Sequence, residues 1–332
     1  MAGRGNLHVI LGAGGAIGTP LAAELLARGE RLRAVSRSGR GPEGAERLRA
    51  DITDATAVLH AVEPGSTVYL LVGLPYDRRV WRETWPVIMR NVVTACAAKS
   101  AHLLFFDNVY LYGRVAGPMT EATPMRPASA KGAVRAEVAG YLQAEMAAGR
   151  VTAMIARAAD FYGPHAERSS VPGILVFERL AAGKPARVLI RPDAPHSYTF
   201  TLDCARALVL LAAADDAYGQ VWHLPTASPP LTGRQLVELA AGALGVAPRF
   251  TVTPGWLVRL AGLLDTTMRE VGEMLYQNEG SYVFDSSKFA ARFSFAPTPY
   301  AEGVRATVRR LRGPAGEGGR RTDEGGAGAA DV

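Results

Sequence analysis

The chain has 332 residues, 48% of them hydrophobic, and its 37 Lys and Arg outnumber its 31 Asp and Glu to give a net charge of +6. No run of about 18 apolar residues is present, which excludes a membrane-spanning helix. The arginines are scattered and form no basic stripe among aromatic residues, so we expect no nucleic-acid partner. No apolar signal region precedes the first expected strand, and the two cysteines, Cys96 and Cys204, are far apart. We therefore expect a cytoplasmic protein with reduced thiols.

The first half of the chain alternates between short apolar runs and segments with helical spacing. The apolar runs predict buried strands at residues 7–11, 31–37, 67–72, 102–106 and 151–156. They lack the polar alternation of a half-exposed strand, as is typical of parallel strands that helices cover on both faces. Helical segments lie between them at 16–29, 78–99 and 128–149. The pattern predicts an α/β fold, a doubly wound parallel sheet of the Rossmann type, over residues 1–160.

The second half has a different texture, because proline-rich turns separate its helical segments. These segments are predicted at 172–182, 201–214, 231–244 and 255–277. We expect residues 161–312 to form a smaller, mostly helical substrate-binding region, with some segments returning to the first domain. Residues 313–332 are rich in glycine and charge, which predicts a disordered tail.

A glycine-rich turn, LGAGGAIG, follows the first strand and opens the first helix. Its spacing is GxxGxxG: Gly12 permits the tight turn, Gly15 lets a pyrophosphate approach the backbone, and Gly18 lets helix and strand pack closely. The free N–H groups at the start of the helix would then hold the phosphates. The loop predicted to bind a dinucleotide comprises Gly12, Ala13, Gly14, Gly15, Ala16, Ile17 and Gly18.

The end of the second strand indicates which dinucleotide is bound. An acidic residue there would bind the ribose 2′-hydroxyl of NAD. The sequence has Ser36, Arg37 and Ser38 instead, a cation flanked by hydroxyls, which suits a 2′-phosphate. The cofactor predicted is NADPH/NADP+, and the competing interpretation is that Arg37 is a solvated surface residue.

Several ordered motifs resemble an extended or atypical short-chain dehydrogenase/reductase over roughly residues 6–310. GAGGAIG resembles the glycine fingerprint, ADITD the segment at the adenine, and VGLPY the segment beside the cofactor after the third expected buried strand. Asn91 falls where the family has a structural asparagine, and RAADFYGP resembles the motif that closes over the nicotinamide. The cofactor contacts that the resemblance implies are Asp51, Ile52, Val72, Gly73, Leu74, Lys131, Asp160 and Phe161.

The sequence departs from that family at the active site. Where the family has a catalytic Ser or Thr, DNVYLYG has Asn108, preceded by Asp107. Aligning KGAVRAE with the family's YGxxKxxE puts Lys131 at the tyrosine and Arg135 at the lysine. The arginine that nucleotide-sugar enzymes use on a diphosphate becomes His196. The usual Ser-Tyr-Lys triad is therefore absent, and the catalytic candidates are Asp107, Asn108 and Lys131.

Without the tyrosine, the proton for a hydride-transfer reaction needs another source. Lys131 is one candidate, and tyrosines 110, 112, 162 and 198 are reserves. The substrate is the other candidate, because a phenol beside a ketone can give its proton to the new alkoxide. Among members that lack the tyrosine, the chain most resembles the angucyclinone-type ketoreductases of aromatic polyketide biosynthesis. Tyr112, His196 and Tyr198 would then contact the substrate.

Three classes of function stay open. The favoured one is an NADPH-dependent ketoreductase acting on a bulky hydroxylated aromatic ketone, and no metal is expected. A nucleotide-sugar epimerase or dehydratase is the alternative, although that chemistry needs the base that is missing. A non-enzymatic NADP-sensing protein is the third, although the aromatic stretches at 222–225 and 276–282 suit a substrate pocket. The helices at 78–99 and 128–149 either pair in a homodimer or only cover the sheet.

Overall fold

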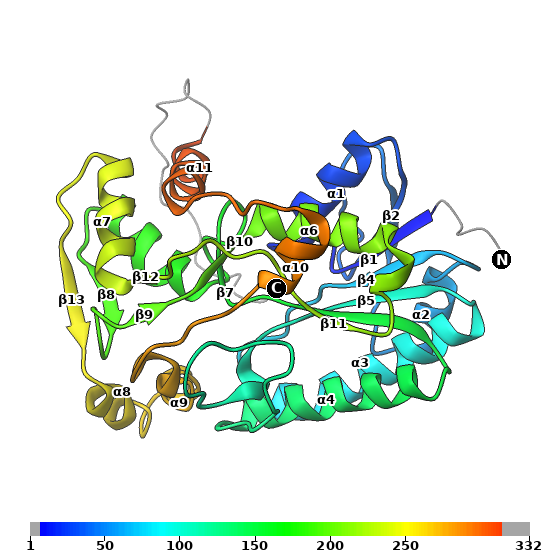
Figure 1. Ribbon diagram of the computed structural model, residues 1–332, viewed down its shortest axis with the longest axis horizontal. Helices are drawn as coiled ribbons and strands as arrows, with labels where there is room; N and C mark the ends of the chain where they lie inside the picture. Colours follow the sequence, from blue (N-terminus) through cyan, green and yellow to red (C-terminus); the bar gives the residue numbers. More distant parts are fainter. Residues whose placement is uncertain (1–6, 314–332) are drawn as a thin grey trace.

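Seven parallel strands form the central sheet of the computed structural model, which describes residues 7–313 (Figure 1). In spatial order the strands are β11 (Val221–His223), β6 (Thr152–Arg157), β5 (His102–Asp107), β4 (Thr67–Leu70), β1 (Leu7–Leu11), β2 (Arg31–Ser36) and β3 (Glu46–Arg49). Every neighbouring pair is parallel. The chain runs from β1 outward to β3 and then returns to β4 on the other side of β1. This reversal confirms the predicted doubly wound sheet, in which ligands bind at the carboxyl ends of the strands.

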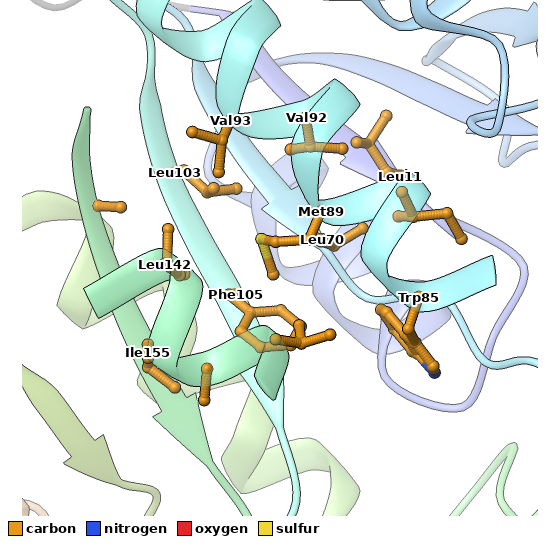
Figure 2. Close-up of a cluster of buried hydrophobic side chains, with 14 of the residues drawn as sticks. Leu11, Leu70, Trp85, Met89, Val92, Val93, Leu103, Phe105, Leu142 and Ile155 are labelled. Atoms are coloured by element: carbon orange, nitrogen blue, oxygen red, sulfur yellow. The ribbon is translucent and has the colours of Figure 1, made fainter. Parts of the chain in front are cut away.

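Helices cover both faces of the sheet, because successive strand residues point to opposite sides. On one face Leu11, Leu70 and Phe105 pack under α2 (Ala55–Ala61), α3 (Arg78–Ala98) and α4 (Ala130–Ala147). Figure 2 shows this cluster, with Trp85, Met89 and Val92 of α3 over the strands. On the other face Ile10, Tyr69 and Leu104 pack under α1 (Gly18–Ala27) and α6 (Thr201–Ala213).

A smaller region lies beyond the carboxyl ends of the strands and has a core of its own, which includes Phe177, Leu236 and Val304. It contains three two-stranded sheets. Its strands are β7 (Asp160–Tyr162), β8 (Ala186–Leu189), β9 (Pro195–His196), β10 (Tyr198–Phe200), β12 (Leu231–Thr232) and β13 (Phe250–Thr253). Its helices include the π-helix at Gly173–Phe177, α5 (Glu178–Ala181), α7 (Gly233–Leu244) and α11 (Tyr300–Arg312). Its strands are short, and helices make up most of its regular structure, as the sequence predicts.

Segments of the second half return to the first domain. Strand β11 pairs with β6, and α6 packs beside α1. The helix α10 (Ser287–Phe293) contacts β11. Two further elements are 3-10 turns, one at Tyr110–Tyr112 in the first half and one at Asp215–Ala217 in the second. The exact boundaries at 160 and 312 stay predictions, and residues 314–332 lie outside the described part of the chain.

The single helix predicted over 255–277 is wrong. The structure has α8 (Gly255–Ala261), α9 (Thr266–Gly272) and a 3-10 turn at Leu275–Asn278. A Cβ at Gly262 would lie 2.9 Å from the Cα of Arg269, so the chain folds back tightly there. The Asp265 carboxylate accepts a hydrogen bond from the Met268 N–H at 2.8 Å and starts a new helix.

Strands β3 and β11 were not predicted. The short strand β3 reads ERLR and lies at the edge of the sheet, and β11 spans only three residues, so neither carries a long apolar run. The long helices α3 and α4 pack against each other on the sheet (Figure 1), and their pairing in a homodimer stays a prediction. Among residues 7–313, no helix is both long and apolar enough to cross a membrane.

Candidate active site

The glycine-rich loop between β1 and α1 has the backbone geometry of a phosphate cradle. Gly12 has φ +98°, and a Cβ there would lie 3.0 Å from the backbone of Val72. A Cβ at Gly18 would lie only 2.2 Å from the Gly12 carbonyl oxygen, so helix and loop touch there. At Gly15 the nearest atom would be 3.4 Å away, and at Gly14 nothing lies within 4 Å. Gly12 and Gly18 are thus required by the fold, whereas Gly14 and Gly15 leave the backbone accessible.

The amino end of α1 adds free hydrogen-bond donors to this cradle. Its N-cap residue Ile17 offers no side-chain acceptor to the first turn. Uncapped N–H groups at a helix start attract anions. The loop from Gly12 to Gly18, including Ala13 and Ala16, therefore fits a dinucleotide pyrophosphate.

The residues predicted to meet the adenosine also lie together. The Asp51 carboxylate accepts from the N–H and hydroxyl of Thr53 at 2.9 and 2.8 Å. These hydrogen bonds are the main cause that lowers the pKa of Asp51, and the charge of Arg37, which is exposed after β2, contributes to it. Asn91 of α3 donates to the carbonyls of Ile52 and Thr53 at 3.2 and 2.9 Å, which fixes this loop against the helix.

Two other segments that the sequence predicts to contact the cofactor, residues 36–38 and 72–74, lie beside the cradle. The Ser36 hydroxyl donates to the Arg40 carbonyl at 2.9 Å, and it lies 3.5 Å from the hydroxyl of Ser38. Both serines are thus next to Arg37 on one turn. The segment Val72–Leu74, which includes Gly73, leaves β4 as a loop whose first residue touches Gly12. The structure brings these segments to one edge of the sheet.

Asp107, at the carboxyl end of β5, lies between two buried guanidinium groups. Its Oδ1 accepts from Arg135 Nε at 2.7 Å, and its Oδ2 accepts from Arg157 Nε at 3.2 Å. Asp107 is 1% exposed, and both arginines are buried. The side chain of Asn108 accepts from the Tyr110 N–H at 3.0 Å. Arg135, at the position of the family's lysine, is therefore neutralised by an aspartate.

Tyr112 belongs to the same buried network. Arg157 Nη1 donates to its hydroxyl at 2.8 Å, and His223 Nε2 lies 2.7 Å from that oxygen. Burial is the main cause that lowers the pKa of His223 to about 3, so its imidazole is neutral. The side chains of Asp107 and Tyr112 are both buried and already paired, so little of either is accessible to a substrate. Their direct contact with a substrate stays a prediction.

Lys131, at the position of the family's tyrosine, is completely buried in the first turn of α4. Its Nζ lies 2.5 Å from Glu270 Oε2 and 2.6 Å from Glu273 Oε1. The ring of Tyr76 covers it, with the centroid 4.2 Å away. The backbone N–H of Ala130 also donates to Glu273 at 3.0 Å. Sequence reasoning missed both glutamates, because they are 139 and 142 residues from Lys131 and lie in a segment with no catalytic motif.

A hollow lies in the smaller region, and Asp160, which follows the end of β6, forms part of its lining. Its polar lining consists of Asp160, Arg187, His196, Tyr198 and Asn278. Its walls are otherwise apolar, with Val171, Pro172, Leu175, Val176, Val188, Leu189 and Leu236. The predicted substrate contacts His196 and Tyr198 and the predicted cofactor contact Asp160 thus meet in one cavity, while Phe161 is half-buried next to Asp160.

Asp160 and His196 are hydrogen-bonded, with His196 Nε2 2.9 Å from Asp160 Oδ2. The His196 ring contacts two tyrosines, with centroid distances of 4.8 Å to Tyr198 and 5.6 Å to Tyr282. Burial, with a contribution from the charge of Asp160, raises the pKa of Tyr76, Tyr110, Tyr198, Tyr276 and Tyr282. These phenols stay protonated at neutral pH. Within residues 7–313, no group of three His, Cys, Asp or Glu side chains could hold a metal ion.

Comparisons with known proteins agree with this arrangement. The model of the NAD dependent epimerase/dehydratase family matches residues 8–224. A Thermus thermophilus UDP-glucose 4-epimerase complex with NAD has 21% identity and a TM-score of 0.76, over 93% of this chain and 100% of that one. The Streptomyces venezuelae dTDP-glucose 4,6-dehydratase DesIV double mutant, with NAD and DAU bound, has 18% identity and a TM-score of 0.75, over 93% and 97%. The Bacillus cereus UDP-glucuronic acid 4-epimerase in complex with NAD has 16% identity and a TM-score of 0.72, over 92% and 98%. No curated protein sequence matches.

Proposed function

We propose that this chain, which belongs to the NAD dependent epimerase/dehydratase family, an extended type of short-chain dehydrogenase/reductase, is an NADPH-dependent ketoreductase. The substrate proposed is a bulky hydroxylated aromatic ketone of the angucyclinone type. When bound, the reduced cofactor supplies a hydride to the carbonyl carbon. The chain supplies the cradle for the phosphates, orientation of the ketone and a route for the proton.

The observation that carries this proposal is that Lys131 is buried in ion pairs. Its ammonium is buried between Glu270 and Glu273, so the position that usually holds the acid–base tyrosine is part of an ion cluster. Oxidation of a sugar hydroxyl requires a base in that place. Reduction of a ketone requires only that a proton arrive, and a phenol beside the carbonyl carries one. The ion pairs therefore favour a substrate proton over Lys131.

The lining of the hollow supports the aromatic part of the proposal. Val171, Leu175 and Leu189 offer apolar walls, against which part of an aromatic ring would bury apolar surface. Asp160, His196 and Asn278 offer a few polar groups to its oxygens.

NADPH is proposed on account of Arg37. Its exposed guanidinium, flanked by Ser36 and Ser38, follows β2 at the place where a ribose 2′-phosphate would lie. The solved structures named above contain NAD, so the 2′-phosphate preference is a proposal about this chain's own residues.

Nucleotide-sugar epimerase or dehydratase activity is the second candidate, and the comparisons favour it. The family model and the solved structures with similar folds are named for that chemistry. The structural likenesses lie below 25% identity, so they support the fold more directly than the reaction.

An NADPH-oxidation assay with hydroxy-aryl ketones, together with product analysis of nucleotide sugars incubated with the oxidised cofactor, separates the candidates, because an epimerase or dehydratase regenerates its cofactor within each turnover. We expect NADPH oxidation only with the ketones. Turnover of nucleotide sugars alone would replace the proposal with the second candidate, and tight cofactor binding without any turnover would indicate a sensor.

The same assay tests the proton source. Methylation of the phenol beside the ketone should slow reduction strongly while binding persists, if the pocket admits the methyl group. Lys131→Met should lose much less than the about 10²–10⁴-fold that removal of a general acid costs, measured per folded protein. A full loss with every ketone would return the acid role to Lys131.

A further inference from the structure

His196 and Asp160 are hydrogen-bonded to each other, and both line the hollow. Asp160 lies three residues beyond the end of β6, and β7, which it begins, pairs in parallel with β10 at Tyr198. His196 is held from the other side by a bridge to Tyr282. Backbone pairing therefore fixes both side chains at the carboxyl edge of the sheet, where the ligands of such folds bind.

The hydrogen bond determines which nitrogen of His196 is free. An ionised carboxylate only accepts hydrogen bonds, so Nε2 carries the proton that it donates to Asp160 Oδ2 at 2.9 Å. Within the described chain, no residue bonds Nδ1 of His196. The ring is flanked by Tyr198 and Tyr282, which restrict its rotation. Nδ1 is thus a fixed, unpaired proton-exchanging atom in a residue that lines the hollow.

Other titratable groups near the pair are less suited to exchange a proton. The tyrosines that feel the charge of Asp160 all have a raised pKa, mainly because of burial. Arg187 of β8 lines the same hollow, and a guanidinium keeps its proton. Lys131 is held by two carboxylates. An imidazole, by contrast, can both accept and donate a proton through a free ring nitrogen.

We infer that His196 and Asp160 form an acid–base pair in which the His196 imidazolium gives its Nδ1 proton to the substrate oxygen that becomes negative on hydride addition. This inference rests on the proposed function. With a hydroxy-aryl ketone, the alkoxide takes the phenol's proton and His196 protonates the resulting phenolate. With a ketone that has no phenol, His196 protonates the alkoxide directly, and reduction is slower because no proton lies within the substrate beside the carbonyl. In both cases the imidazolium becomes a neutral imidazole, and Asp160 stays ionised and orients the ring.

The kinetic test uses His196→Asn, with His60→Asn on the exposed end of α2 as the matched control. For the methyl ether we expect His196→Asn to lose about 10²–10⁴-fold in rate, with unchanged NADPH affinity. For the free phenol the loss should be smaller, because the substrate carries a proton. Equal rates with the methyl ether in both proteins would overturn the inference.

A second measurement does not depend on turnover. In ¹⁵N NMR spectra of the wild type, neutral His196 should carry its proton on Nε2, and Asp160→Ala should abolish this preference. A wild-type His196 protonated on Nδ1, or a tautomer unaffected by Asp160→Ala, would refute the pair. If the spectra agree with the pair but no ketone is reduced, the proposed function fails and the pair stands.

Discussion

The cofactor loop at residues 12–18 and the buried ion pairs of Asp107 and Lys131, which we call the floor, are stabilised by different interactions. The loop depends on close backbone approach, as at Gly18, where a Cβ would lie 2.2 Å from a carbonyl oxygen. The floor depends on buried charge, with Asp107 between Arg135 and Arg157 and Lys131 between two glutamates. The first region has the backbone geometry of a phosphate cradle, while in the second the residues at the family's catalytic positions are held in ion pairs. The two regions are therefore stabilised by different kinds of interaction, which separate substitutions can test.

The largest effect is expected from the floor. Asp107→Asn would leave the Arg135 and Arg157 guanidinium groups buried without their counter-charge. Removal of one partner of a buried pair costs about 3–5 kcal/mol, which chemical denaturation would measure. Asp193→Asn, at the exposed pair with Arg234, is the control and should leave unfolding nearly unchanged. Equal stability of both variants would mean that the floor is not held by charge.

His223 gives the floor a predictable response to acid. Its pKa is about 3 in the folded chain, against an ordinary 6.5. Between these values the unfolded chain binds a proton that the folded chain does not, so the free energy of unfolding falls as the pH falls. We expect about 1 kcal/mol per pH unit from this group. Denaturation curves of His223→Gln should show a shallower slope in that window. An identical slope would show that His223 is protonated in the fold.

Two substitutions in the cradle should affect different properties, one the stability of the fold and the other the binding of NADPH. Gly18→Val places side-chain atoms against the Gly12 carbonyl and should cost about 1–3 kcal/mol of stability, as overpacking does. Gly15→Val has room at its Cβ, so it should fold normally and fail to bind NADPH. Thermal unfolding and cofactor titration measure the two effects. Normal NADPH binding by Gly15→Val would show that this loop is not the phosphate cradle.

The smallest change in stability is expected at the exposed Arg37. Arg37→Ala should weaken NADPH by about 1.5–3 kcal/mol, the range for hydrogen bonds to charged groups, and leave NADH nearly unchanged. Calorimetric titration with both cofactors provides the comparison. Equal losses for NADPH and NADH would remove the basis for the 2′-phosphate assignment.

The two regions also differ in what the sequence could predict. The roles of Gly12 and Gly18 follow from local requirements of a strand–turn–helix unit, and the structure gives both residues the expected close contacts. The helix break at Gly262 was missed because its cause is a tertiary contact with Arg269. Apolar periodicity continues across that position, so the pattern alone predicts one helix.

The candidate site was harder to predict because its charges are paired by residues distant in sequence. Lys131 and Arg135 were found by alignment with a motif, whereas their partners were not. Glu270 and Glu273 belong to a segment with no motif, and Arg157 looks like an ordinary strand residue. His196 and Asp160 were each selected, and their hydrogen bond across 36 residues is visible only in the fold.

The cluster around Lys131 also has an evolutionary consequence. Lys131→Tyr would leave Glu270 and Glu273 without the ammonium between them, at positions 139 and 142 residues further along the chain. Loss of one member of a buried ion cluster is strongly destabilising. Replacing the glutamates before Lys131 would be destabilising for the same reason, because the ammonium would then be buried without its carboxylates. Descendants of this sequence would therefore reach tyrosine-dependent chemistry only through coordinated changes in two distant segments, because each single step passes through a less stable protein.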